Sequence, residues 1–172
     1  MAMLSFDVRS VAAKAVQVDA ELSPQDPVWQ DGDPVPSGPL HVSGRLSPAG
    51  PAGERFYWHG HVEGNVTLPC RRCLAETTVH VQDEAHVIFA EAGSDDTEDP
   101  DVYVLDERSH QIDLKPAVRE QWLLNVPGFA ECRAECRGIC PSCGKDLNDG
   151  PCDCGAARDA RWDALRKVKT KD

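Results

Sequence analysis

The sequence predicts an α+β protein that is rich in β-structure, with antiparallel strands forming a sheet or partial barrel, one packed helix and a cysteine-rich C-terminal segment. Three observations predict this class. Apolar and polar residues alternate with period two in several stretches before residue 90. Apolar residues follow helical spacing in one later stretch, 114–126. Six of the eight cysteines then fall between residues 132 and 154.

The N-terminal third is expected to hold strands on either side of a loop. Residues 3–22 are predicted to form one or two strands, with Val16, Val18 and Ala20 on one face. Residues 23–38 contain repeated prolines and aspartates, which hold neither a helix nor a ladder, so an exposed loop is expected. Alternation returns in residues 39–47 and predicts a half-buried strand.

The middle of the chain is predicted to form a long hairpin. Alternating apolar residues from Arg55 to Leu68 indicate one strand, and Pro69 ends it. The segment Cys70-Arg-Arg-Cys73 follows directly, and alternation resumes over residues 77–89. The first cysteine pair is therefore expected in the turn between two long strands.

The segments after the hairpin are shorter. Residues 91–100 are predicted to form an acidic loop, and short strands are predicted at 102–105 and 111–112. A helix is expected next, with Asp113 as its cap and Pro127-Gly128 after its end.

Three parts of the chain follow from this order. We expect a β-rich domain at 1–126 that carries the hairpin cysteines and the helix, a cysteine-rich segment at 127–157, and a basic C-terminal helix or tail at 158–172.

Cysteine spacing is the strongest chemical signal in the chain. Two Cys-x-x-Cys pairs with four further cysteines nearby are typical of structural zinc, because two residues between thiolates let both reach one ion. We predict two zinc ions per chain. The predicted ligands are Cys70, Cys73, Cys132, Cys136, Cys140, Cys143, Cys152 and Cys154.

Disulfides and redox-active dithiols are the alternatives to zinc. The 172-residue chain, 41% hydrophobic, is long enough for a real core and does not need disulfide staples. No apolar run of signal-peptide or membrane-spanning length is present in the sequence. A reduced, cytoplasmic location is therefore expected, without membrane association, and clustered thiols there favour metal.

Eight thiols divide into two four-coordinate sites. Loop closure favours one site from the four cysteines at 140, 143, 152 and 154, which lie within fifteen residues. The remaining four, at 70, 73, 132 and 136, would then join the hairpin turn to the later segment. The alternative pairs 70 and 73 with 140 and 143. Because few apolar residues lie in the cysteine-rich segment, we expect it to need metal to fold.

No catalytic set is visible in the sequence. Two closed tetrahedral sites leave no coordination position for substrate or water, so we expect a protein that is not an enzyme and takes no small-molecule substrate. His59 and His61 share one face of the long strand, which we interpret as its solvent face; metal binding by this His-x-His pair is the alternative. The other histidines, at 41, 80, 86 and 110, are isolated in the sequence.

Net charge constrains the partners. The formal charge is −11, and a strongly acidic chain is a poor non-specific binder of nucleic acid. Any RNA contact should be local. The weak candidates lie in the basic tail and are Arg158, Arg161, Arg166, Lys167, Lys169 and Lys171. Five basic residues also border the thiols, where we expect them to offset thiolate charge, with phosphate contact as the alternative; they are Arg71, Arg72, Arg133, Arg137 and Lys145.

Four features follow one another in this chain: the CRRCL turn, an acidic break, QIDL before a helix, and the run ECRAECRGICPSCGKDLNDGPCDC. This order of parts resembles the YceD family of large ribosomal RNA subunit accumulation proteins. The resemblance is strongest over 66–154 and weak before residue 60, and the proline- and glycine-rich stretch 23–53 departs from it. It implies metal binding and a part in 23S rRNA maturation or accumulation.

Together these inferences predict a zinc-binding, non-enzymatic factor in 23S rRNA processing and large-subunit biogenesis. It would act as an adaptor on a ribosomal precursor or on a protein of the processing machinery. Three alternatives remain open. They are a thiol redox sensor that releases zinc on oxidation, a module that binds RNA through the basic tail, and a nuclease.

Overall fold

The computed structural model describes residues 4–50, 55–92, 102–105 and 110–155. The chain divides into two compact units. The first comprises Met1–Leu68 and Thr78–Gly128, and the second comprises Pro69–Thr77 and Phe129–Asp172. The short segment that carries the first cysteine pair thus belongs to the same unit as the six later cysteines.

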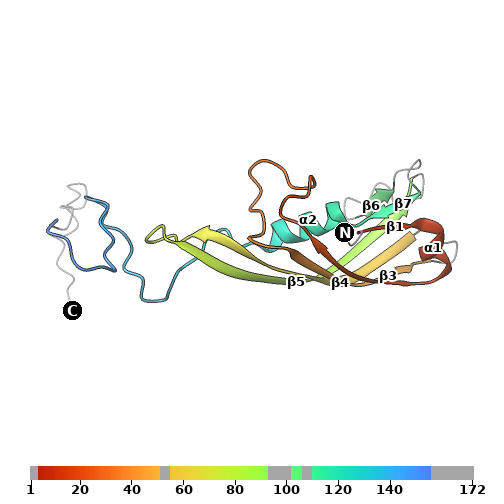
Figure 1. The fold of residues 1–172 in the computed structure, drawn as a ribbon, viewed down its shortest axis with the longest axis horizontal. Coiled ribbons are helices and arrows are strands. Elements are labelled where there is room, and N and C mark those ends of the chain that lie inside the picture. Colours follow the sequence, from red (N-terminus) through yellow and green to blue (C-terminus); the bar gives the residue numbers. More distant parts are fainter. Residues whose placement is uncertain (1–3, 51–54, 93–101, 106–109, 156–172) are drawn as a thin grey trace, which may run out of the picture. The chain divides into compact units, whose positions relative to one another are not determined.

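Figure 1 shows the helices and strands in chain order. They are β1 (Ser5–Asp7), α1 (Val8–Ala13), β2 (Val16–Leu22), β3 (Leu40–Pro48), β4 (Arg55–Pro69), β5 (Glu76–Glu91), β6 (Val102–Leu105), β7 (Gln111–Asp113) and α2 (Lys115–Asn125).

The main sheet has the strand order β2-β3-β4-β5-β6. Strands β2, β3 and β4 pair antiparallel, as predicted. Strand β6 instead pairs parallel to β5, with Ile88 opposite Val102, so this edge of the sheet departs from the predicted antiparallel pairing. A separate ladder joins β1 to β7.

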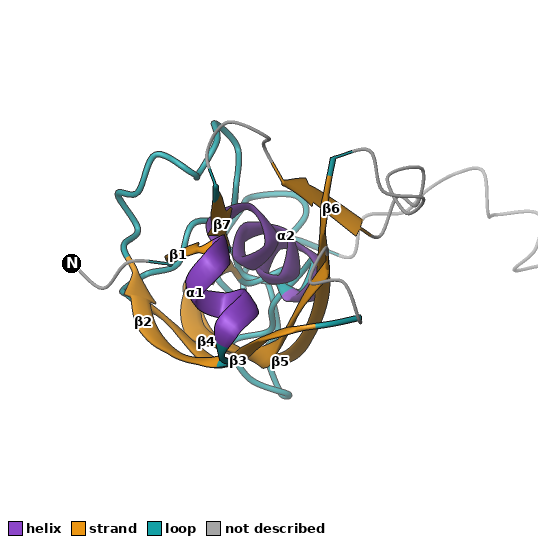
Figure 2. Ribbon diagram, turned by 90° about the vertical axis from the view of Figure 1, so that its right-hand side faces the viewer, coloured by secondary structure: helices purple, strands orange, loops and turns teal. Residues whose placement is uncertain are grey.

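The core of the first unit lies inside the curve of the sheet, where both helices pack (Figure 2). Strand residues alternate between buried and exposed positions, which confirms the period-two prediction. Trp58, Phe56 and Phe89 from the strands and Trp122 from α2 are the largest fully buried side chains. The outer face of β4 and β5 carries mostly polar residues, with Ile88 of β5 40% exposed.

Two glycines allow β3 and β4 to approach closely. Gly44 lies opposite Gly60 in the register, and a Cβ atom on Gly60 would lie 2.0 Å from the Ser43 carbonyl oxygen. Gly44 also has a φ of +139°, which side-chain-bearing residues rarely adopt. Both glycines are therefore required by the close approach of the two backbones.

One helix was not predicted. Residues 8–13 form α1 between the strands expected in 3–22. Asp7 caps it, because its carboxylate accepts the backbone N–H of Ser10 at 2.9 Å. Six residues are too few for helical periodicity to be visible in the sequence.

The loop 23–38 has neither helix nor strand, as predicted, but it is not simply exposed. Lys115, Arg119 and Trp122 of α2 all contact it. The Lys115 ammonium donates to Asp26 at 2.8 Å, and the Trp122 indole donates to the Pro34 carbonyl at 2.7 Å. The loop thus covers one face of α2, because positions 115, 119 and 122 share that face.

Helix α2 begins close to the predicted cap. Its N-cap residue is Leu114, and the Asp113 carboxylate accepts the backbone N–H of Lys115 at 3.0 Å. Within the described ranges, no helix is long and apolar enough to cross a membrane. Most of the predicted acidic loop, and the predicted C-terminal helix, lie outside the described residues.

Candidate metal centres

The second unit gathers the eight cysteines into two tetrads. The first tetrad is formed by Cys70, Cys73, Cys132 and Cys136, and the second tetrad by Cys140, Cys143, Cys152 and Cys154. Within each tetrad the four sulfur atoms lie within 4.8 Å of one another. This grouping is the one that loop closure favoured, and the alternative pairing of the two Cys-x-x-Cys turns is wrong.

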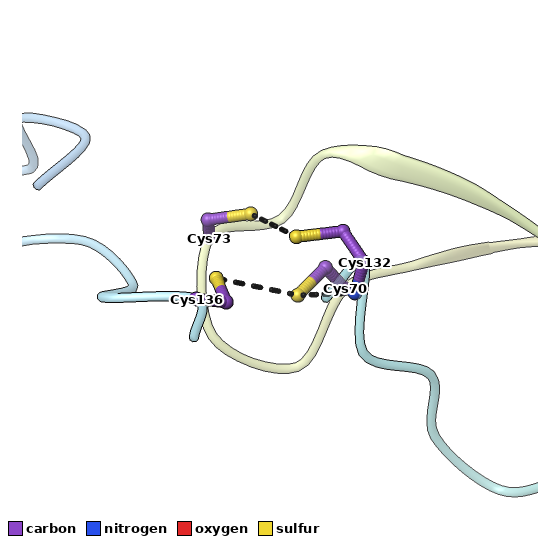
Figure 3. Close-up of side chains that lie close together, drawn as sticks. All are labelled: Cys70, Cys73, Cys132 and Cys136. Atoms are coloured by element: carbon purple, nitrogen blue, oxygen red, sulfur yellow. Dashed lines mark hydrogen bonds between the residues drawn. The ribbon is translucent and has the colours of Figure 1, made fainter. Parts of the chain in front are cut away.

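The first tetrad has the dimensions of a tetrahedral thiolate site (Figure 3). The sulfur atoms of Cys70 and Cys136 are 3.9 Å apart, and those of Cys73 and Cys132 are 3.6 Å apart. A tetrahedral zinc ion with Zn–S bonds of about 2.3 Å separates its sulfurs by roughly 3.8 Å. The donor set therefore fits Zn²⁺ in both spacing and chemistry.

The two Cys-x-x-Cys turns have the same pattern of backbone hydrogen bonds. In the first, Cys70 N donates to Ala75 O at 2.8 Å and Leu74 N donates to Cys70 O at 2.9 Å. In the second, Cys140 N donates to Lys145 O at 2.8 Å and Gly144 N donates to Cys140 O at 2.9 Å.

The residue after each turn is left-handed, with a φ of 63° at Leu74 and 73° at Gly144. A leucine with this positive φ has a strained backbone, because its Cβ atom crowds the following carbonyl oxygen, whereas glycine has no Cβ atom and avoids the strain. Both turns therefore present a cysteine pair in one geometry, although only the second has a glycine at the position that follows.

Hydrogen bonds join the two tetrads within the second unit. The Asn148 side chain, which lies between Cys143 and Cys152, donates to the Cys136 sulfur at 3.5 Å. Its oxygen accepts the Arg137 backbone N–H at 2.9 Å. These bonds place a side chain from the loop of the second tetrad against a ligand of the first.

A backbone contact supports the same junction. Ile139 N donates to the Arg72 carbonyl at 3.0 Å, and the Arg72 guanidinium donates to the Cys136 carbonyl at 2.9 Å. Gly138 makes this approach possible, because a Cβ atom there would lie 2.9 Å from Arg72 O. The chain between the tetrads is thus tied to the first Cys-x-x-Cys turn.

Backbone donors favour the thiolate form at one cysteine of each tetrad. The N–H groups of Cys132, Cys73 and Arg72 lower the pKa of Cys70 to about 6. Those of Cys143 and Ser142 lower the pKa of Cys140 to about 6. Metal binds cysteine as thiolate, so these donors prepare both sites for a cation near neutral pH.

The basic residues beside the thiols have partners of their own. Arg71 pairs with Glu131, and its guanidinium stacks 4.5 Å from the centre of the Phe129 ring. Lys145 donates to the Pro151 carbonyl at 2.9 Å. With Arg72 on the Cys136 carbonyl, three of the five basic residues act within the unit.

The structure brings together two histidines that are distant in the sequence. His86, which is isolated in the sequence, stacks on His59 with ring centroids 4.6 Å apart and an interplanar angle of 10°. His59 and His61 are exposed, as predicted. The cluster was missed because His86 and its neighbour Glu84 lie on β5, and sequence spacing does not give the β4–β5 register.

The six predicted RNA-contact residues cannot be placed at the site, because residues 156–172 lie outside the described part of the chain.

Comparison with known proteins points to one family. The family described as "Large ribosomal RNA subunit accumulation protein YceD" matches residues 58–169. The chain is 33% identical over 86 residues to Bacillus subtilis YlbN, which covers 49% of each chain.

It is also 33% identical over 112 residues to Mycobacterium tuberculosis Rv2926c, covering 60% of this chain and 53% of that protein. The chain therefore spans about half the length of the curated relatives it matches. No solved structure matches it.

Proposed function

Because this chain belongs to the YceD family of large ribosomal RNA subunit accumulation proteins, we propose that it is a zinc-binding factor in 23S rRNA processing and accumulation. It acts in the cytoplasm during assembly of the large ribosomal subunit. Its role is that of an adaptor and not of an enzyme. The observation that carries the zinc assignment is the pair of four-sulfur tetrads, each within 4.8 Å.

Zinc would have a structural role in this proposal. Each tetrad offers four thiols, which complete a tetrahedral shell and leave no position for substrate. The described part of the second unit has no regular helix and little strand apart from the ends of β4 and β5. Few buried apolar residues lie in it apart from the cysteines, so metal is the main source of order there.

The charge of the described part of the second unit, around the cysteines, favours a protein partner over direct phosphate contact there. Its described residues carry five basic side chains against six carboxylates, and the thiolates add further negative charge. A surface of that balance does not attract the phosphate backbone of RNA. Adaptor docking on a protein of the precursor or of the processing machinery fits the charge better.

Exposed apolar side chains supply a docking surface in the same unit. Leu74 follows Cys73 and is 62% exposed, and Phe129 precedes Ala130 and is 61% exposed. Ala130 pairs with Cys70 in an isolated bridge, so both apolar residues lie next to segments that hold the first tetrad. We propose that loading the first tetrad fixes this surface.

The test is complementation in cells that lack the protein, with mature and precursor 23S rRNA measured. Wild type should carry two zinc ions by native mass spectrometry and restore mature rRNA. Cys136→Ser should lose zinc from the first tetrad and fail. Leu74→Asp and Phe129→Asp should keep both ions and still fail.

The matched control is Leu124→Asp on α2, which alters an equally exposed leucine (70%) in the first unit. Equal behaviour of Leu124→Asp and the two docking variants would remove the proposed surface. Full rescue of mature rRNA by Cys136→Ser would show that zinc at the first tetrad is not needed for the function.

The purified protein, together with the same cells, tests the alternatives. A redox sensor would release zinc in peroxide, and it would do so at concentrations that alter rRNA maturation. An RNA-binding module would lose RNA affinity on deletion of 158–172. A nuclease would cleave precursor RNA when purified. The adaptor role is the one that stands if the protein keeps its zinc in peroxide, if deletion of 158–172 leaves RNA affinity unchanged, and if the purified protein does not cleave precursor RNA.

A further inference from the structure

A group of metal-binding side chains lies on the first unit, away from the cysteines in the sequence. The group consists of His59 on β4 and of Glu84 and His86 on β5. One nitrogen of each imidazole and one carboxylate oxygen of Glu84 all lie within 4.8 Å of one another. All three side chains are exposed. Their strand neighbours Phe56, Trp58 and Val87 point into the core, so the group lies on the outer face of the sheet.

Both imidazoles turn the same nitrogen toward one carboxylate. His59 Nε2 lies 2.6 Å from Glu84 Oε1, and His86 Nε2 lies 3.6 Å from the same oxygen. The two rings are nearly parallel. Two nitrogens and one oxygen thus converge from adjacent strands on one point outside the sheet.

A neighbouring side chain orients His86. The Tyr57 hydroxyl lies 2.6 Å from His86 Nδ1, which leaves Nε2 to face Glu84. Metal-binding histidines usually engage their second nitrogen in this way, which fixes the tautomer and the ring. The group therefore has a supporting hydrogen bond as well as converging ligands.

A simple ion pair explains less of this arrangement. One protonated imidazole satisfies one carboxylate, as at His80, which lies 3.4 Å from Glu63 on the same two strands. A second imidazole stacked on the first adds repulsion if both are charged. A divalent cation instead satisfies both nitrogens and the carboxylate together.

We propose that His59, Glu84 and His86 form a third metal site, separate from the cysteine tetrads. Its ligand is a divalent first-row transition ion such as Zn²⁺, because imidazole nitrogen suits these ions, whereas Mg²⁺ and Ca²⁺ select oxygen donors. Three protein ligands leave positions for water. The site is therefore open and exchangeable, unlike the tetrads.

The experiment titrates Zn²⁺ into the full chain as purified with zinc, by isothermal calorimetry, with native mass spectrometry counting ions. Wild type should bind one further, weaker equivalent. His59→Gln and His86→Gln should each abolish that equivalent while the more tightly held zinc content stays unchanged. Tyr57→Phe should weaken the added equivalent by roughly tenfold, because it removes the partner of His86 Nδ1.

His80→Gln is the matched control, since it breaks a single His–Glu pair on the same strands. All of the substituted side chains are exposed or half-buried, and circular dichroism checks that each variant folds. The absence of a further equivalent in wild type under a large excess of zinc would overturn the proposal. So would a further equivalent that persists in both His59→Gln and His86→Gln, or one that His80→Gln removes. Because each variant is compared with wild type, these outcomes do not depend on how many ions the tetrads hold.

Discussion

The Asn148 side-chain amide donates to the Cys136 sulfur across 3.5 Å, and this bond connects the two tetrads. Asn148 belongs to the loop that the second tetrad closes, whereas Cys136 belongs to the first tetrad. Desolvation raises the pKa of Cys136, but hydrogen bonds from the Asn148 amide, the Gly138 N–H and the neighbouring thiols together outweigh it and lower the pKa. A well-ordered loop at the second tetrad, which holds Asn148 in place, thus favours the thiolate form of Cys136 in the first tetrad.

Replacing Asn148 should weaken zinc binding at the first tetrad. Asn148→Ala removes the donor to Cys136 and should lower affinity there by about 10- to 100-fold, as loss of outer-shell partners does at other metal sites. The measurement is zinc transfer to a competing chelator, resolved by site. Ser142→Ala is the control, because it keeps the backbone N–H that donates to Cys140. Equal affinity in the Asn148 and Ser142 variants would contradict the link.

The two Cys-x-x-Cys turns should respond in opposite ways to exchange of the residue that follows them. Gly144→Leu places a side chain at a φ of 73° and should cost about 1–2 kcal/mol. That is roughly a 5- to 30-fold loss in affinity at the second tetrad.

Leu74→Gly relieves the same strain and should leave the first tetrad equal or slightly tighter, since greater chain freedom offsets part of the gain. Competition with a chelator measures both variants. A loss of affinity in Leu74→Gly would show that the leucine side chain itself supports the turn.

Zinc removal should unfold one unit and spare the other. Structural zinc contributes about 10–16 kcal/mol of apparent binding free energy, more than the small apolar content of the second unit can replace. After chelation, amide hydrogen exchange should speed up in 69–77 and 129–155. Protection should persist in β2 and β3, which pair within the apolar core of the first unit. Uniform loss of protection, or none, would contradict the division.

The loop 23–38 should stabilise α2 in a pH-dependent way. Arg119 donates two hydrogen bonds to Asp33, at 2.7 and 2.8 Å, and they lower the pKa of this carboxyl from its ordinary 3.8. A lowered pKa in the folded state adds stability above pH 3.8. That stability is lost as the pH falls through the lowered value.

Asp33→Asn should therefore lower the free energy of unfolding at neutral pH, and its difference from wild type should shrink below pH 3.8. Urea unfolding at several pH values measures this difference. Arg45→Met, which changes an exposed arginine on β3, should show a smaller effect without that pH dependence. A difference that stays constant into acid would mean that the carboxyl is not responsible.

Much of the architecture could be predicted from local pattern. Alternation placed β3, β4 and β5 nearly to the residue, because one buried face imposes period two. Helix α2 followed from its spacing and from Pro127-Gly128. Helix α1 was too short to show a period. The parallel pairing of β6 could not be predicted, because direction depends on how the chain returns to the sheet and not on the strand's own residues.

The sequence by itself determined that eight thiols suit two four-coordinate sites, and short loop closure favoured one of them at 140, 143, 152 and 154. Only the tertiary structure decided what meets across strands and between loops. It brought His86 and Glu84 to His59, laid residues 23–38 on α2, and set Asn148 against Cys136. These contacts join residues that are distant in the chain, or they depend on side-chain direction. Local spacing carries neither kind of information.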